Sequence, residues 1–158
     1  MGSEFGQEWE WNHDGQLQWD LLQHPAHGGL YGLVRDLNRL YRDEPALHQL
    51  DFDGAGFYWV DADNSEDSVL AFCRMPEHGH EHRIYVVINM TPVVREGYVL
   101  PVYDVGQYAE LLNTDSVHYN GTNVGNAGTL TAKQRGDGQA LELTLPPLAA
   151  IYIKKAVG

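Results

Sequence analysis

The chain has 158 residues, of which 43% are apolar, and it carries a formal net charge of −12. This length suits one domain, or one domain with a fragment of another, and the apolar content is sufficient for a core. Only 10 residues are Lys or Arg, so we expect neither nucleic acid nor anionic membrane as a partner, whereas neutral ligands such as sugars remain compatible. The sequence has no run of about 18 apolar residues and no N-terminal secretory pattern, which predicts a cytoplasmic protein without a membrane span.

Residues 1–28 predict no regular element and combine flat aromatic rings with polar side chains, a mixture that stacks on sugars and binds hydroxyls. These side chains are Trp9, Trp11, Trp19, Asn12, His13 and Asp14. The tryptophans equally suit packing at a domain edge. Glycoside chemistry uses two carboxyl groups about 5–10 Å apart. Proximity in sequence does not establish that geometry for the acidic side chains here, Glu4, Glu8, Glu10 and Asp14.

An amphipathic helix is predicted over residues 30–41, where apolar residues recur at steps of three and four. Arg42 lies in the predicted last turn, where its positive charge interacts favourably with the negative end of the helix dipole. Pro45 disfavours helical geometry at the residue before it. We therefore expect the helix to end near Asp43 and its apolar face to dock on another surface.

From Gly54 onward the pattern changes to short runs of aromatic and β-branched residues bounded by turn formers. The predicted strands are residues 56–61, 68–74, 83–90, 98–103, 108–112, 129–134, 139–145 and 149–154. The second and third are nearly continuous in apolar residues, which predicts central strands covered on both faces. Short strands without intervening helical patterns predict an antiparallel β-sandwich.

Three shorter features complete the pattern. His78, His80 and His82 alternate in a polar loop, where a solvated hairpin tip is favoured over a metal site because no ligand cluster of defined spacing supports one. Cys73 lies in an apolar run and is predicted to be a small buried filler. Residues 135–138 predict a hairpin turn.

Residues 113–128 predict an ordered loop because Asn, Gly, Ser, Thr and Asp favour turns. Loops of this length without regular structure usually have a function. Tyr119, with Asn120, Asn123 and Asn126, suits either contact with a glycan or bracing of a neighbouring domain. The sequence leaves both alternatives open.

Several segments occur in the order found in one family. They are MGSEFGQEWEWNHD, LVRDLNRLYRDEPALHQLDFD, INMTPVVREGY, LLNTDSVHYNGTNVGN and LTLPPLAAIYI. Together they resemble the C-terminal part of bacterial 1,4-α-glucan (glycogen) branching enzymes of the α-amylase superfamily, and the resemblance covers essentially the whole chain. It implies a mainly β fold, the α-amylase C-terminal all-beta sandwich, preceded by a helix-containing remnant of the end of a (β/α)8 barrel. The implied domains are residues 1–50, the end of the barrel, and residues 51–158, the sandwich.

The resemblance also implies a function and its limit. Branching enzymes cleave an α-1,4 bond, hold the donor as a covalent glycosyl intermediate on a carboxylate, and transfer it to a 6-hydroxyl to form an α-1,6 branch. Such chemistry needs a nucleophilic carboxylate and an acid/base carboxyl group. In the family these carboxylates precede the part that this chain matches, so no catalytic residue is carried over. We therefore expect the isolated chain to be inactive, with no cofactor and no metal.

The partners implied by the resemblance are an α-glucan, namely glycogen, amylose or amylopectin, bound through the parent enzyme, and the catalytic barrel of that parent. The predicted substrate-binding residues are Trp9, Trp11, Asn12, His13 and Tyr119. The alternative function is an autonomous α-glucan-binding module that uses exposed rings among Trp59, Tyr98, Tyr103, Tyr108 and Tyr119. Exposed rings would favour the module, and buried rings would favour a supporting role. Without a barrel to cover it, the helix face predicts self-association.

Overall fold

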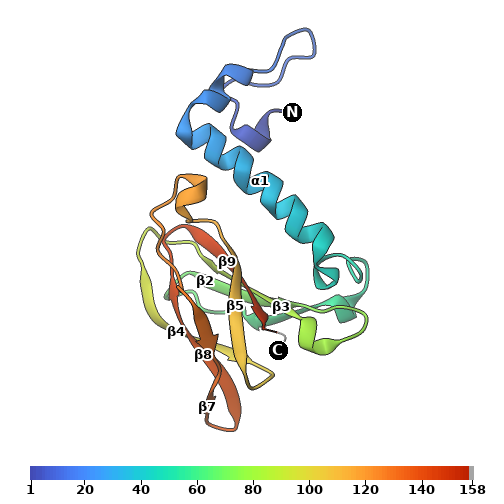
Figure 1. Cartoon of the computed structure of the whole chain (residues 1–158), viewed down its shortest axis with the longest axis vertical. Helices are drawn as coiled ribbons and strands as arrows, with labels where there is room; N and C mark the ends of the chain where they lie inside the picture. Colours follow the sequence, from blue (N-terminus) through green and yellow to red (C-terminus); the bar gives the residue numbers. More distant parts are fainter. Residues whose placement is uncertain (157–158) are drawn as a thin grey trace.

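The computed structural model describes residues 1–156 and shows two antiparallel sheets packed face to face, with one long helix lying across one end (Figure 1). The six-stranded sheet has the order β1 (Phe57–Asp61), β2 (Val69–Arg74), β3 (Ile84–Asn89), β9 (Ala149–Lys155), β5 (Gln107–Asn113) and β6 (Thr129–Thr131). The three-stranded sheet has the order β4 (Arg95–Val102), β8 (Gly138–Leu145) and β7 (Lys133–Arg135). The predicted antiparallel sandwich is confirmed.

The main core lies between the two sheets. Its fully buried members include Val69, Ala71, Cys73, Tyr85, Val87, Leu100, Tyr108, Leu141, Leu143, Leu145, Ile151 and Ile153. Strand β3 contributes to two clusters, because Tyr85 and Val87 face this core while Ile84 and Val86 face a second one on the outer side of the sheet. The prediction of a strand covered on both faces is therefore confirmed for β3. In β2 one face is fully buried and the other only half-buried.

The predicted single strand over residues 129–134 is wrong, because the chain there changes sheets. Residues 129–131 form β6 beside β5, and residues 133–135 form β7 beside β8. At the break the amide of Ala132 donates to the carbonyl of Gly106, 2.9 Å away. Leu130 and Ala132 both pack on the core. Residues 129–135 therefore contribute one strand to each sheet. The alternation of residues in the sequence does not show where the chain passes from one sheet to the other.

The helix α1 spans Pro25–Asp43 and begins before the predicted start. Pro25 occupies the first turn, where a missing N–H costs nothing and the fixed φ suits a helix. The predicted end at Asp43 is confirmed. The expectation that residues 1–28 hold no regular element is wrong, because they also contain two short 3-10 turns, η1 (Ser3–Phe5) and η2 (Trp19–Gln23). No helix in residues 1–156 is long and apolar enough to cross a membrane.

The C-terminal end of α1 is fixed to the outer face of the six-stranded sheet. Leu40 packs with Ala46 and Leu47, from the 3-10 turn η3 (Pro45–Leu47), against Ile84 and Val86. The ammonium group of Lys154 in β9 pairs with the carboxylate of Glu44 at 2.5 Å. The Asp51 carboxylate also joins Tyr41 of the helix to Arg74 of β2.

Cys73 is fully buried in the core, as predicted. Burial raises the pKa of its thiol to about 11, so the reactive thiolate is scarce at neutral pH. We expect Ellman's reagent to titrate no thiol in the native chain and one thiol per chain in denaturant. Rapid labelling of native protein, with unchanged circular dichroism, would contradict this.

Candidate functional site

The structure places four of the five predicted substrate-binding residues together in the loop between η1 and η2, beyond the N-terminal end of α1 (Figure 1). Trp9 is 73% exposed, and Trp11, Asn12 and His13 are also exposed. The Trp11 and His13 ring centroids lie 6.4 Å apart. The loop base is held by the Gln18 side-chain oxygen, which accepts from the amide of Glu8 at 3.1 Å. Binding of glucan by this loop stays a prediction.

Tyr119, the fifth predicted residue, lies in a different segment, between β5 and β6. It ends the 3-10 turn η6 (Val117–Tyr119), which contacts α1. Its half-buried hydroxyl donates to the Asp36 carboxylate of the helix at 3.0 Å. Burial, followed by this hydrogen bond, raises the pKa of Tyr119. This contact between η6 and α1 suits the bracing role, and contact of Tyr119 with a glycan stays a prediction.

The remaining aromatic residues proposed for a binding module divide into two groups. Tyr98 is half-buried and donates to Asp61 at 2.9 Å, and the fully buried Tyr108 donates to the Asp104 carbonyl at 2.9 Å. In contrast, Trp59 is 53% exposed and Tyr103 is 74% exposed. Of these four rings, the last two therefore offer accessible faces.

Trp59 and Tyr103 line one cavity of about 580 Å³ at the open edge of the sandwich, between β1 and the β4–β8 pair. Its lining residues are Tyr58, Trp59, Val60, Pro101, Val102, Tyr103, Val105, Asp137, Gly138 and Gln139. The aromatic and aliphatic walls suit stacking on the apolar face of a sugar ring, and Asp137 and Gln139 supply polar groups for hydroxyls. The sequence analysis named both Trp59 and Tyr103 as candidate binding rings. It did not predict that they line one cavity, because they lie in segments that are distant in the chain.

Two buried residues, Arg83 and Tyr85, contact Tyr103. The Arg83 guanidinium lies 4.5 Å from its ring centroid, and Arg83 is itself 7% exposed. The backbone amide of Tyr103 donates to the Tyr85 hydroxyl at 3.0 Å. A ring held in this way loses little conformational freedom when it binds a ligand. Among the described residues that line the cavity, Asp137 is the one carboxyl group, whereas glycoside hydrolysis uses a pair.

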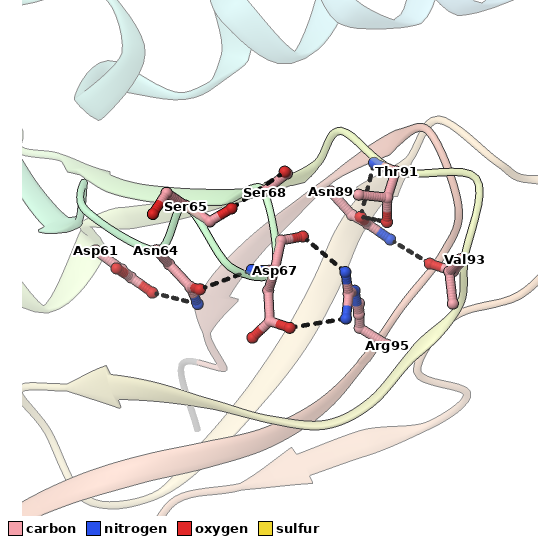
Figure 2. A network of polar contacts seen from close by, with 9 residues as sticks. All are labelled: Asp61, Asn64, Ser65, Asp67, Ser68, Asn89, Thr91, Val93 and Arg95. Atoms are coloured by element: carbon pink, nitrogen blue, oxygen red, sulfur yellow. Dashed lines mark hydrogen bonds and ion pairs between the residues drawn. The ribbon is translucent and has the colours of Figure 1, made fainter.

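A second cavity, of about 520 Å³, lies farther along the same edge and is polar. Figure 2 shows its network, in which the Arg95 guanidinium donates to the Asp67 carboxylate at 2.7 Å and the Asp67 carbonyl at 3.0 Å. Asn64 donates to Asp61 at 3.3 Å, and the buried Asn89 amide donates to the Val93 carbonyl at 2.8 Å. The contacts between Arg95 and Asp67 tie the β1–β2 turn to the start of β4.

The histidine loop forms the exposed connection between β2 and β3, with His80–His82 in the 3-10 turn η5. Within residues 1–156 no group of three or more His, Cys, Asp or Glu side chains is placed to hold a metal ion.

Comparison with known proteins identifies the class of protein to which the sandwich and its preceding helix belong. The family described as the alpha amylase C-terminal all-beta domain matches residues 59–156. The chain therefore belongs to this family. A crystal structure of an α-amylase from H. orenii shares the fold, with a TM-score of 0.52 and 16% identity, over 91% of this chain and 24% of that one.

More specifically, the chain is similar to bacterial 1,4-alpha-glucan branching enzymes GlgB. It is 49% identical over 156 residues to the enzyme of Aromatoleum aromaticum, covering 97% of this chain and 24% of that enzyme. It is 51% identical over 153 residues to that of Nitrobacter hamburgensis, covering 97% of this chain and 21% of that enzyme. The chain thus corresponds to the C-terminal part of such an enzyme and spans less than a quarter of these relatives. The boundary at residue 50 stays a prediction.

Proposed function

We propose that this chain is the C-terminal portion of a cytoplasmic 1,4-α-glucan branching enzyme, in which it supports the barrel that makes α-1,6 branches during glycogen synthesis. The observation that carries the proposal is the identity of about half of the residues to branching enzymes over 97% of the chain. The helix agrees with it. Although α1 carries apolar residues along one face, Gly29 is the one buried residue among its 19 described positions. Its half-exposed face suits coverage by the rest of an enzyme.

A chimaera tests this supporting role. The matching C-terminal segment of the Aromatoleum aromaticum enzyme is replaced by this chain, and branching of amylose is followed by α-1,6 linkages. We expect activity from the chimaera and none from the enzyme truncated at the same point. A chimaera that folds as a single species but forms no branches would overturn the proposal.

The isolated chain is expected to be inactive, because it carries no residue matching the family's catalytic carboxylates. Incubation of the purified chain with amylose should yield no α-1,6 linkages by NMR, with the intact relative as the positive control. Formation of branches by the chain alone would contradict this expectation.

A second candidate function is α-glucan binding by the sandwich itself, through the cavity lined by Trp59 and Tyr103. The specific observation in its favour is that the exposed residues Trp59 and Tyr103 both line one cavity, whereas Tyr108 is buried and Tyr98 is half-buried. Stacking of aromatic rings supplies affinity for a neutral polymer without help from net charge.

Native electrophoresis with and without amylopectin tests this second function. We expect the wild-type chain to be retarded, and Trp59→Ala with Tyr103→Ala to abolish the retardation. Phe52→Ala removes a fully exposed ring outside the cavity and serves as the matched control. Trp9→Ala with Trp11→Ala assigns any remaining retardation to the predicted N-terminal loop. Unchanged mobility of the wild type would leave only the supporting role.

The half-exposed helix face also leads us to propose self-association of the isolated chain. Tyr31 is 43% exposed and Tyr41 is 45% exposed on α1. Light scattering should give a mass that rises with concentration, and a strictly monomeric mass at high concentration would contradict this.

A further inference from the structure

The helix α1 is attached to the sandwich at two separate places (Figure 1). Its C-terminal end is anchored by Leu40, Leu47 and the ion pair between Glu44 and Lys154. An anchor at one end fixes where a rod is attached but leaves its direction free. The direction depends on the second attachment, which runs from Gly29 to Asp36 of the helix.

The second attachment is formed by η6, which lies at the tip of the loop between β5 and β6, residues 114–128. A β-carbon built on Gly29 would lie 2.5 Å from the Tyr119 carbonyl oxygen, so the loop backbone rests directly on the helix at this glycine. Farther along the helix, the Tyr119 hydroxyl bonds to Asp36. The Asp36 carboxylate also accepts from Arg35 at 3.1 Å. The tip thus combines close backbone packing with one directional bond.

The loop is rigid enough to act as a strut, because the buried Asp115 organises it. One oxygen of Asp115 accepts from the Thr122 amide at 2.9 Å, and the other accepts from the Thr122 hydroxyl at 2.6 Å and the Val124 amide at 3.0 Å. Gly121 is packed against the same residue, since a β-carbon there would lie 2.2 Å from the Asp115 carbonyl oxygen.

The base of the loop is fixed to both sheets through Asn126. Its side-chain amide donates to Glu110 of β5 and to the Thr144 carbonyl of β8, each at 3.0 Å. Its side-chain oxygen accepts from the Thr144 amide at 2.8 Å. The base of the loop is therefore bonded to a strand of each sheet.

We propose that the Asp115-centred loop is a strut that sets the angle of α1 on the sandwich, with Gly29 as its seat and Asp115 as its positioning residue. The strut fixes residues 1–24, including the loop that holds Trp9 and Trp11, relative to the sandwich. All the residues that form the strut lie within this chain. The role of the strut in orienting parts of a branching enzyme rests on the proposed function. A negative result in the chimaera or glucan assays would overturn that function but would not bear on the strut, which is tested separately below.

A pair of glycine substitutions isolates the strut, because alanine is the better helix former at both positions. At Gly29 a methyl group would displace Tyr119, whereas at Gly32 it would lie 3.8 Å from the Tyr119 ring, an ordinary contact. Gly32→Ala should therefore raise the melting temperature and leave the geometry unchanged. Gly29→Ala should free the N-terminal half of α1 despite its better helix propensity.

Spin-label distances measure the angle directly in the full chain. Labels at Ser3→Cys and Glu142→Cys report the far end of α1 against β8, and labels at Arg42→Cys and Glu142→Cys report the anchored end. Cys73 is buried and stays unlabelled in the folded chain. The expected result is a narrow distribution for both pairs in the wild type and in Gly32→Ala. In Gly29→Ala only the Ser3 pair should broaden.

Asp115→Asn is the second variant, and it keeps the test decisive if Gly29→Ala fails to fold. It should give the same selective broadening, because it loosens the strut without touching the helix. A distribution that stays narrow for the Ser3 pair in the folded variants would overturn the strut. Equal broadening of both pairs would also overturn it, since that result indicates general loosening of the sandwich.

Discussion

Leu143→Ala is expected to lower the free energy of unfolding by about 2–5 kcal/mol, the range found when a buried leucine is truncated. Leu143 is 1% exposed and belongs to the core between the two sheets. In the ladder it stands opposite Tyr98 of β4. The loss combines the transfer free energy of the removed methyl groups with that of the cavity they leave.

Urea denaturation followed by tryptophan fluorescence measures this change. Leu148→Ala is the matched control, because it removes the same atoms from a side chain that is 68% exposed. It should alter the free energy of unfolding by less than about 0.5 kcal/mol. Equal losses for the two variants would mean that Leu143 is not packed in the core as described.

Asp115→Asn is expected to destabilise the chain by about 1–3 kcal/mol near neutral pH, because an amide N–H would face the backbone N–H of Val124. Burial alone would raise the pKa of Asp115, but the hydrogen bonds from Thr122 and Val124 outweigh it and hold that pKa below its usual value. The folded chain therefore binds this proton less readily than the unfolded chain does.

The sign of the pH effect follows from that depression. The stabilisation by Asp115 is fully present above the unfolded pKa, about 3.9. It is lost as the pH falls through the lower folded pKa. Urea midpoints of wild type and Asp115→Asn, compared from pH 2 to 6, should differ by a constant amount above about pH 5 and converge in acid. A gap that widens on acidification would contradict the assignment.

The two candidate glucan-binding surfaces have different physical origins. Trp9 and Trp11 are neighbours in sequence and lie in one exposed loop. Trp59 lies in β1 and Tyr103 directly follows β4, and the two residues line one cavity because β1 and β4 are edge strands of the two sheets. The electrophoresis variants therefore separate two surfaces.

Local sequence determined much of this protein. Alternation of Leu141, Leu143 and Leu145 specifies a strand with one buried face, because side chains in a strand point to opposite sides in turn. Pro45 specifies the end of α1 through the geometry of the residue before it. The ordered motifs specified the family, and with it the sandwich. The first two depend on residues that are close in the chain, whose preferences act before any tertiary contact forms, whereas the family follows from motifs spread along the whole sequence.

Tertiary structure alone decided the rest. The division of residues 129–135 between two sheets, the exposure of Trp59 and Tyr103 beside buried Tyr108, and the seat of Tyr119 on Gly29 all depend on segments distant in the sequence. A periodic pattern states that a side chain is buried or exposed on its own element. The pattern does not show which other element packs against that side chain, because this depends on how the layers pack in space.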